Sequence, residues 1–170
     1  MQSVDLGVIM PIPNDVGCRI CPTICMSSDT SNDDASPRAP IVMVVEDDTL
    51  IRKTVGRKLQ AAGYEVILVP SAADALIIAQ RMEFQVLVLD LQLVDVDPFS
   101  GLHEGFAVLD WLERQLGEIK FRTVIYTSQG GEHLLKKAEA KGVFAFCTKR
   151  RDMSNLLQCV DEAVRSLKAA

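Results

Sequence analysis

The chain lacks the features that would assign it to a membrane, secretory or nucleic-acid-binding class. Its longest apolar runs are interrupted well before the roughly 20 residues that a membrane span requires. No Lys or Arg precedes Arg19, and the N-terminus has no compact apolar segment, so it does not resemble a secretory signal. A formal net charge of -5 and a pI of about 5.0 argue against a basic surface for nucleic acid. We therefore expect a cytoplasmic protein that contacts neither membrane nor nucleic acid directly.

Cysteine is scarce outside the N-terminal quarter of the chain. Three of the five cysteines form a C-x2-C-x3-C group: Cys18, Cys21 and Cys25. Thiolates at short spacing are typical of a metal or cluster site, but no fourth ligand is evident nearby. The other interpretations are incidental thiols in a flexible leader, or a biological start at Met26 that would remove all three. Without a secretion signal, five cysteines indicate a reducing compartment and no disulfide framework.

Residues 1–40 differ in composition from the rest of the chain. They hold five of the seven prolines, and two arginines against five aspartates give them a formal charge of 2 − 5 = −3. The run SSDTSNDDASPRAP has almost nothing to bury and is typical of a disordered segment. We therefore expect a disordered leader over residues 1–40 and a single folded unit over residues 41–170.

Apolar runs and helical patterns alternate from residue 41 onward. Strands are predicted at residues 41–45, 64–69, 86–89, 122–127 and 143–147. A helical pattern follows each strand, and in the first one Ile51, Val55 and Leu59 recur every four residues and share one face. Three polar residues are predicted to cap helices: Asp48, Ser71 and Ser154. Five strand–helix repeats predict an α/β protein with a doubly wound, five-stranded parallel sheet and helices on both faces.

Polar residues follow four of the predicted strands. They are Glu46 and Asp47 after the first strand, Asp90 after the third, Thr127 and Ser128 at the end of the fourth, and Lys149 after the fifth. In such sheets ligands bind at the carboxyl ends of the strands, so these side chains should converge. Converging carboxylates repel one another, and a hard cation such as Mg²⁺ relieves the repulsion. With an ammonium and a hydroxyl nearby, the set suits an aspartate that attacks a phosphoryl phosphorus.

In order and spacing, these groups resemble the receiver domains of two-component response regulators. The matching stretches are VVEDD, VLVLD, VIYTS and FCTK. Asp47 and Asp90 are 43 residues apart and Thr127 and Lys149 are 22 apart, both of which are usual for the family. The resemblance covers residues 41–168 and implies a flavodoxin-like (βα)5 fold with three α/β/α layers.

The resemblance also implies a role for each matching residue. Asp90 would accept the phosphoryl group, Thr127 would bind it and Lys149 would pair with it. The implied Mg²⁺ ligands are Glu46, Asp47, Asp90 and the backbone carbonyl of Gln92. Phe146 occupies the position of the family's rotating aromatic, so Thr127 and Phe146 are the predicted switch residues, although an aromatic in a strand is also usual in a core. The implied activity is self-phosphorylation with slow autophosphatase activity at most.

The implied partners are proteins. A histidine kinase or phosphotransfer protein would supply the phosphoryl group in a Mg²⁺-dependent phosphorelay. A rearranged face of the fourth helix, fifth strand and fifth helix would pass the signal to a downstream protein target, and the same face is a candidate for homodimerisation. Because the chain ends with the fifth helix, we expect a stand-alone receiver that acts through a partner, a relay or phosphate storage.

The pattern departs from the family in two places. Asp90 reaches Gly105 in fifteen steps, several more than usual, which indicates an inserted loop near residues 94–104. Three further acids fall in this loop, where solvation, helix capping or partner choice is expected of them: Asp95, Asp97 and Glu104. Arg150 replaces the proline that usually follows the lysine, and we expect a trans bond there because a non-proline cis bond costs about 3 kcal/mol.

Two alternative functions remain at this point. The run Asp95-Val96-Asp97 resembles the D-x-D motif of haloacid-dehalogenase-type phosphatases, but it lies five residues past the apolar run and precedes Pro98. The other alternative is a degenerate receiver that serves as a scaffold, against which the retained acids, Thr127 and Lys149 argue.

Two other polar features receive structural interpretations. Ser128 is predicted to be a small spacer that leaves room for access to the phosphate. The charged run KKAEAK at residues 136–141 is predicted to be a solvated helix face.

Overall fold

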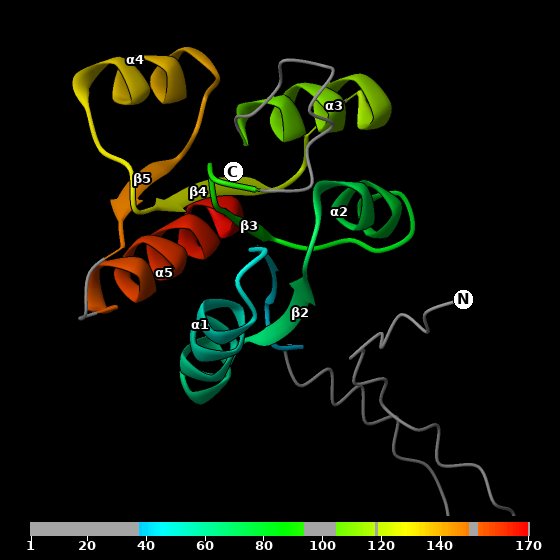
Figure 1. Cartoon of the computed structure of the whole chain (residues 1–170). Helices are drawn as coiled ribbons and strands as arrows, with labels where there is room; N and C mark the ends of the chain where they lie inside the picture. Colours follow the sequence, from blue (N-terminus) through cyan, green and yellow to red (C-terminus); the bar gives the residue numbers. More distant parts are fainter. Residues whose placement is uncertain (1–37, 94–104, 118, 150–152, 170) are drawn as a thin grey trace, which may run out of the picture. The chain divides into compact units, whose positions relative to one another are not determined.

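The computed structural model describes residues 38–93, 105–117, 119–149 and 153–169, and within them five strands alternate with five helices (Figure 1). The strands are β1 (Ile41–Val45), β2 (Glu65–Val69), β3 (Val86–Leu89), β4 (Arg122–Thr127) and β5 (Ala145–Thr148). The helices are α1 (Thr49–Ala61), α2 (Ala72–Ala79), α3 (Phe106–Leu116), α4 (Glu132–Ala140) and α5 (Ser154–Lys168). The predicted alternation of strand and helix is confirmed.

The five strands form one parallel sheet in the order β2-β1-β3-β4-β5. This order confirms the doubly wound, flavodoxin-like fold class. β1 lies between β2 and β3, and its last residue, Val45, pairs with Val69 on one side and Leu89 on the other. The chain segments that leave β1 and β3 therefore start level with each other at the carboxyl edge of the sheet.

Alternate residues of the strands face two separate cores. In β1, Val42 and Val44 share a core with α1 and α5, whereas Met43 and Val45 share the other core with α2, α3 and α4. This is the period of two that a strand imposes on its side chains. Figure 1 shows α1 and α5 together on one side of the sheet and the other three helices across it, which gives the three layers.

Two of the three predicted helix caps are confirmed. The Asp48 carboxylate accepts two backbone N–H groups at the start of α1, and Ser71 accepts the N–H of Asp74 at the start of α2. The prediction for α5 was wrong, because this helix begins at Ser154 itself and Met153 holds the cap position. A residue with helical backbone angles cannot also provide the extended geometry of an N-cap.

The last strand lies further along the chain than predicted. It was expected at residues 143–147, and it spans Ala145–Thr148. The Val143 N–H still bonds back to α4, which ends at Ala140, because it donates to the Ala138 carbonyl at 3.0 Å. Phe144 makes the first bond toward β4, to the Thr123 carbonyl at 2.8 Å.

Some predictions fall outside the described residues. These concern the leader, its three cysteines, the inserted loop with its three acids, and the peptide bond to Arg150. Among the described helices, none is long and apolar enough to cross a membrane.

Candidate functional site

Three carboxylates gather at the carboxyl edge of the sheet. Glu46 and Asp47 directly follow β1, and Asp90 directly follows β3. The Asp90 N–H donates to the Val45 carbonyl oxygen at 3.0 Å, which carries the pairing of β1 and β3 one step beyond the strands. One carboxylate oxygen from each acid lies within 4.8 Å of the others. The structure thus brings together the three acids that the strand-end pattern predicted.

The Lys149 ammonium bridges two of these carboxylates. Its Nζ lies 2.7 Å from Asp90 Oδ2 and 2.6 Å from Glu46 Oε2. Both carboxylates are almost fully buried, and the lysine side chain is 13% exposed, so water screens these pairs little. The backbone of Lys149 is held as well, since its N–H donates to the Thr127 carbonyl at 2.7 Å. The ends of β1, β3, β4 and β5 are therefore linked through one residue, Lys149.

The electrostatics of the site favour positive charge. Burial raises the pKa of Glu46 above its ordinary value of 4.5, and the charges of Asp90 and Asp47 raise it further, while the bond to Lys149 offsets only part of this rise. Burial lowers the pKa of Lys149, but its bonds to Asp90 and Glu46 outweigh burial and leave the pKa above its ordinary 10.5. The ammonium is thus held in its charged form by two acids.

The donor set fits a divalent cation. Glu46 Oε1 is buried and has no hydrogen-bond partner among the residues that the structure describes. With all groups ionised, three carboxylates and one ammonium carry −3 + 1 = −2, which a divalent ion balances. Mg²⁺ prefers carboxylate, carbonyl and water oxygens and commonly uses only one or two protein carboxylates. An unsatisfied oxygen in an acidic cluster is therefore consistent with Mg²⁺.

A side-chain link that the sequence did not reveal joins the two loops beside Asp90. Ser128 Oγ donates to Gln92 Oε1, and the Gln92 N–H donates to Asp90 Oδ1 at 3.2 Å. Ser128, which was predicted to be a small spacer, also forms a hydrogen bond to Gln92, the residue that was expected to supply a carbonyl ligand. A local sequence pattern cannot predict a bond between residues 36 positions apart.

Arg52 is a second contributor that sequence reasoning missed. Its Nη1 donates to the Glu46 carbonyl at 2.6 Å and to the Asp47 carbonyl at 3.0 Å. The capped start of α1 places Arg52 one turn into the helix, facing back toward the acid pair. Its spacing from the acids was visible in the sequence and is the signal that could have identified it.

The two predicted switch residues lie on adjacent strands. Thr127 is fully buried at the end of β4, and its Oγ1 accepts the N–H of Gln129 at 3.2 Å. Phe146 lies in β5 opposite Ile125 of β4, partly buried against the core that includes α3 and α4. The structure thus gives Phe146 the core packing of an ordinary strand aromatic. Thr127 lies at the carboxyl edge of the sheet, close to Lys149, whereas Phe146 lies two residues before the end of β5.

The lysines of the charged run on α4 are not simply solvated. Lys137 Nζ lies 4.8 Å from the centre of the Phe106 ring in α3, and Lys141 forms an ion pair with Asp110 of the same helix. Lys136 behaves as predicted, with an exposed pair to Glu132 one turn earlier. The expectation of a solvated face was therefore wrong for the side that faces α3, because neighbouring helices on the same face of the sheet supply partners.

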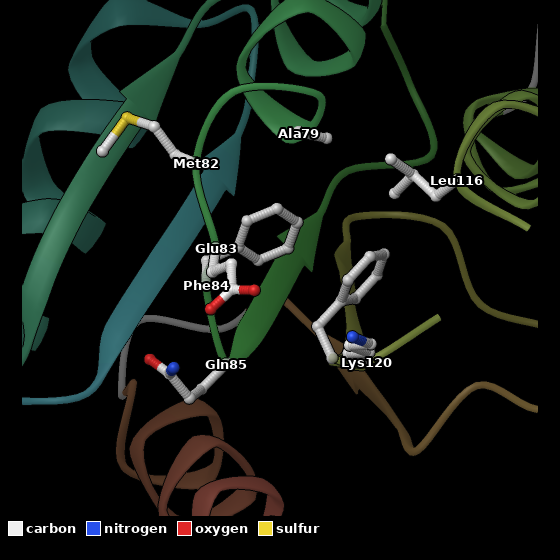
Figure 2. Close-up of a pocket in the computed structure, with 8 residues that line it drawn as sticks. Ala79, Met82, Glu83, Phe84, Gln85, Leu116 and Lys120 are labelled. Atoms are coloured by element: carbon white, nitrogen blue, oxygen red, sulfur yellow. The ribbon is translucent and has the colours of Figure 1, made fainter. Parts of the chain in front are cut away.

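A pocket of about 240 Å³ lies away from the acids (Figure 2). Its walls include Phe84 and Gln85 just before β3 and Lys120 and Phe121 just before β4, so it opens at the amino ends of the strands. The two phenylalanine rings pack with centroids 4.6 Å apart. This pocket contains no acid of the cluster, so the chemistry of the acid site does not take place in it.

Comparisons with known proteins agree with this geometry. A family model described as the response regulator receiver domain matches residues 42–161. GlrR, a transcriptional regulatory protein of Escherichia coli K12, is 29% identical over 123 residues, or 72% of this chain and 26% of GlrR. The signal receiver domain of a putative Luxo repressor protein from Vibrio parahaemolyticus matches with a TM-score of 0.68 and 26% identity, over 77% of this chain and 94% of that one. A CheY-like receiver domain protein from Methanospirillum hungatei matches with a TM-score of 0.67 and 20% identity, over 77% and 98% of the two chains, which shows the shared fold alone.

The sheet order and the three layers define a doubly wound α/β module of the receiver type. The chain belongs to the response regulator receiver domain family. It spans about a quarter of the length of GlrR, so that likeness concerns one region of the longer protein.

Proposed function

We propose that this receiver accepts a phosphoryl group on Asp90 and signals by a change of conformation. The observation that carries the proposal is the Lys149 ammonium, held 2.7 Å from Asp90 Oδ2 and 2.6 Å from Glu46 Oε2 inside a buried site. Burying two carboxylates around one lysine, with the partly buried Asp47 close by, costs stability, and this cost is typical of functional sites. Family membership supports the same role. The proposed unit spans residues 41–170, with an inserted loop near residues 94–104.

The phosphoryl transfer needs one nucleophile and several positive charges. A phosphohistidine of a histidine kinase or phosphotransfer protein is the proposed donor. An Asp90 oxygen forms a bond to phosphorus while the phosphorus–nitrogen bond breaks, and its electron pair stays on the histidine. Transfer removes the negative charge that Asp90 offers to Lys149, so the ammonium pairs with the phosphoryl oxygens instead. The Gln92 N–H holds Asp90 Oδ1 in position before the reaction.

Glu46, Asp47 and Asp90 are the proposed side-chain ligands of Mg²⁺, with the backbone carbonyl of Gln92 as the remaining protein ligand. When bound, the ion neutralises charge on the transferred group. Arg52 holds the carbonyls of Glu46 and Asp47 and so positions both acids. The product is an acyl phosphate on the protein itself, so no turnover of a separate substrate is proposed beyond slow self-dephosphorylation.

The proposed signal starts at Thr127. Its buried hydroxyl lies at the end of β4, next to the strand that carries Lys149. Movement of this hydroxyl toward a phosphoryl group would displace the connection to α4, and Phe146 on β5 would repack with it. The face of α4, β5 and α5 then presents a changed surface to a downstream protein target or to a second copy of the chain.

The test is acceptor activity from a small-molecule donor. The protein is incubated with acetyl phosphate and Mg²⁺, and intact mass is measured for the wild type, Asp90→Asn and Asp95→Asn. We expect the wild type and Asp95→Asn to gain one phosphoryl group and Asp90→Asn to gain none. A phosphorylated Asp90→Asn would overturn the assignment. A wild type that remains unmodified by acetyl phosphate and by a phosphorylated histidine donor would favour a scaffold role.

A further inference from the structure

Two thiols meet between the sheet and the last helix. Cys147 lies in β5 and Cys159 lies in α5, twelve positions later, and their sulfur atoms are 3.2 Å apart. Both are free cysteines, and Cys147 is buried whereas Cys159 is partly exposed. Neither residue has a part in the acid site, because Cys147 faces the core of α1 and α5, on the opposite side of β5 from Phe146.

The meeting follows from the packing of α5 on the sheet. Leu156, Val160 and Ala163 form the buried stripe of this helix, and Cys159 lies beside that stripe, at its partly exposed margin. The Cys147 side chain in β5 lies in the same core, between the sheet and α5. Burial and the hydrogen bond to Cys159 raise the pKa of the Cys147 thiol to about 12. Cys147 therefore keeps its proton, and the more exposed Cys159 is the thiol that an oxidant reaches first.

We propose that Cys147 and Cys159 form a reversible disulfide site that is oxidised by hydrogen peroxide. In the first step the Cys159 thiolate attacks one peroxide oxygen, the oxygen–oxygen bond breaks, and Cys159 becomes a sulfenic acid while the leaving hydroxide takes a proton to form water. In the second step the Cys147 sulfur attacks the sulfenic sulfur, the sulfur–oxygen bond breaks, and the Cys147 proton leaves with the hydroxyl as a second water. Two thiols are oxidised, and one peroxide is reduced to water.

The bond would join β5 to α5 covalently. It closes the segment from residue 147 to residue 159, which contains Lys149. A disulfide forms when two sulfurs approach to about 2.0 Å, so the present contact requires a movement of only about 1 Å. This inference does not depend on the role proposed for Asp90, because thiol oxidation can be measured without any phosphodonor.

The test uses the full chain with Cys18, Cys21 and Cys25 changed to serine, which removes competing thiols. Hydrogen peroxide is added, remaining thiols are alkylated, and the protein is digested with trypsin without reduction. Cleavage after lysine and arginine leaves Cys147 in peptide 142–149 and Cys159 in peptide 152–165. We expect these two peptides as one linked species, which dithiothreitol separates again. Recovery of both peptides unlinked, with alkylated thiols or with Cys159 oxidised beyond the sulfenic acid, would overturn the proposal.

Two single variants assign the order of the steps. Cys147→Ser should leave the Cys159 sulfenic acid without its thiol partner, so dimedone should label peptide 152–165 several-fold more than in the parent protein. Cys159→Ser should abolish dimedone labelling at this pair and leave Cys147 reduced. Equal dimedone labelling of Cys159 in the parent and in Cys147→Ser would show that Cys147 does not resolve the sulfenic acid, and it would contradict the site as proposed.

Discussion

Gly105 lies directly against the backbone of Asp90. A Cβ atom at Gly105 would stand 2.4 Å from the Asp90 carbonyl oxygen and 2.9 Å from the Leu91 Cα. The Gly105 N–H also donates to the Leu91 carbonyl at 2.9 Å. The start of α3 is therefore packed on the residue that carries the proposed chemistry, and the backbone at Gly105 has an ordinary negative φ of −53°. Close approach, rather than a special backbone conformation, is what requires glycine here.

We expect Gly105→Ala to destabilise the protein by about 1–3 kcal/mol, since the methyl group would displace backbone rather than a mobile side chain. The displaced atoms belong to the Asp90 region, so acceptor activity with acetyl phosphate should fall as well. Denaturant unfolding and intact mass measure the two effects.

Gly56→Ala is the matched control. There the added Cβ meets the ends of the Leu68 side chain, at 2.8 Å from its Cδ2. A leucine can rotate, and alanine favours a helix over glycine by up to about 1 kcal/mol, so this variant should stay within about 1 kcal/mol of the wild type. Equal losses in the two alanine variants would show that contact with Asp90 is not the cause.

Lys149→Met should be strongly destabilising at neutral pH. It leaves Glu46 and Asp90 buried without their counter-charge, and breaking a buried pair in this way costs about 3 kcal/mol or more. Lys141→Met removes the ion pair with Asp110, whose side chains are 23% and 38% exposed, and should cost at most about 1 kcal/mol. Urea unfolding of both variants provides the comparison. If Lys149→Met lowers the free energy of unfolding no more than Lys141→Met does, the buried bridge is contradicted.

Mg²⁺ should stabilise the wild type but not Asp47→Asn. A ligand present at 100 times its dissociation constant adds about 2.7 kcal/mol to the free energy of unfolding, which thermal melts with and without MgCl₂ detect. Asp48→Asn is the control, since it removes an adjacent charge while asparagine caps a helix as well as aspartate does. A melting shift that disappears in Asp48→Asn, or persists in full in Asp47→Asn, would exclude Asp47 as a ligand.

Glu46 should give the metal-free protein a pH-dependent stability. Its folded pKa is raised above 4.5, so the folded state holds the proton more tightly than the unfolded chain does. The resulting stabilisation is present in full below pH 4.5 and is lost as pH rises through the raised pKa. Glu46→Gln should remove this part of the loss of stability with rising pH. Mg²⁺ should reduce the same loss in the wild type, because a cation favours the carboxylate. Melting curves from pH 4 to pH 8 test both, and a wild-type decline identical to that of Glu46→Gln would refute the assignment.

Sequence reasoning was sufficient for the fold and for the composition of the acid site. Parallel strands place their carboxyl ends at one edge of the sheet, so polar residues that follow separate strands were expected to lie close together. This is why Asp90, Glu46 and Lys149 could be grouped before any distance was available. The helix starts at Asp48 and Ser71 could also be predicted from the sequence, because a cap bonds to residues only two or three positions away.

Some of the incorrect predictions concern the ends of helices, and others concern neighbours that are distant in the sequence. Val143 and Phe144 have strand-forming side chains, but the Val143 N–H bonds back to Ala138 of α4, and β5 begins only at Ala145. Lys137 and Lys141 have the pattern of a solvated helix face, yet α3 lies beside them and supplies Phe106 and Asp110. Sequence periodicity indicates which side of a helix or strand is apolar. It does not indicate which neighbouring element packs against the polar side.

The sequence alone therefore determined the order of the elements, the parallel sheet and the acids, hydroxyl and lysine at its carboxyl edge. These follow from local periodicity and from the geometry of strand–helix repeats. Only the tertiary structure decided which groups touch: Lys149 between Asp90 and Glu46, Ser128 on Gln92, Gly105 against Asp90, and Cys147 beside Cys159. Such contacts join positions that the chain separates by a dozen residues or more, and their distances depend on how whole layers pack, which no local pattern encodes.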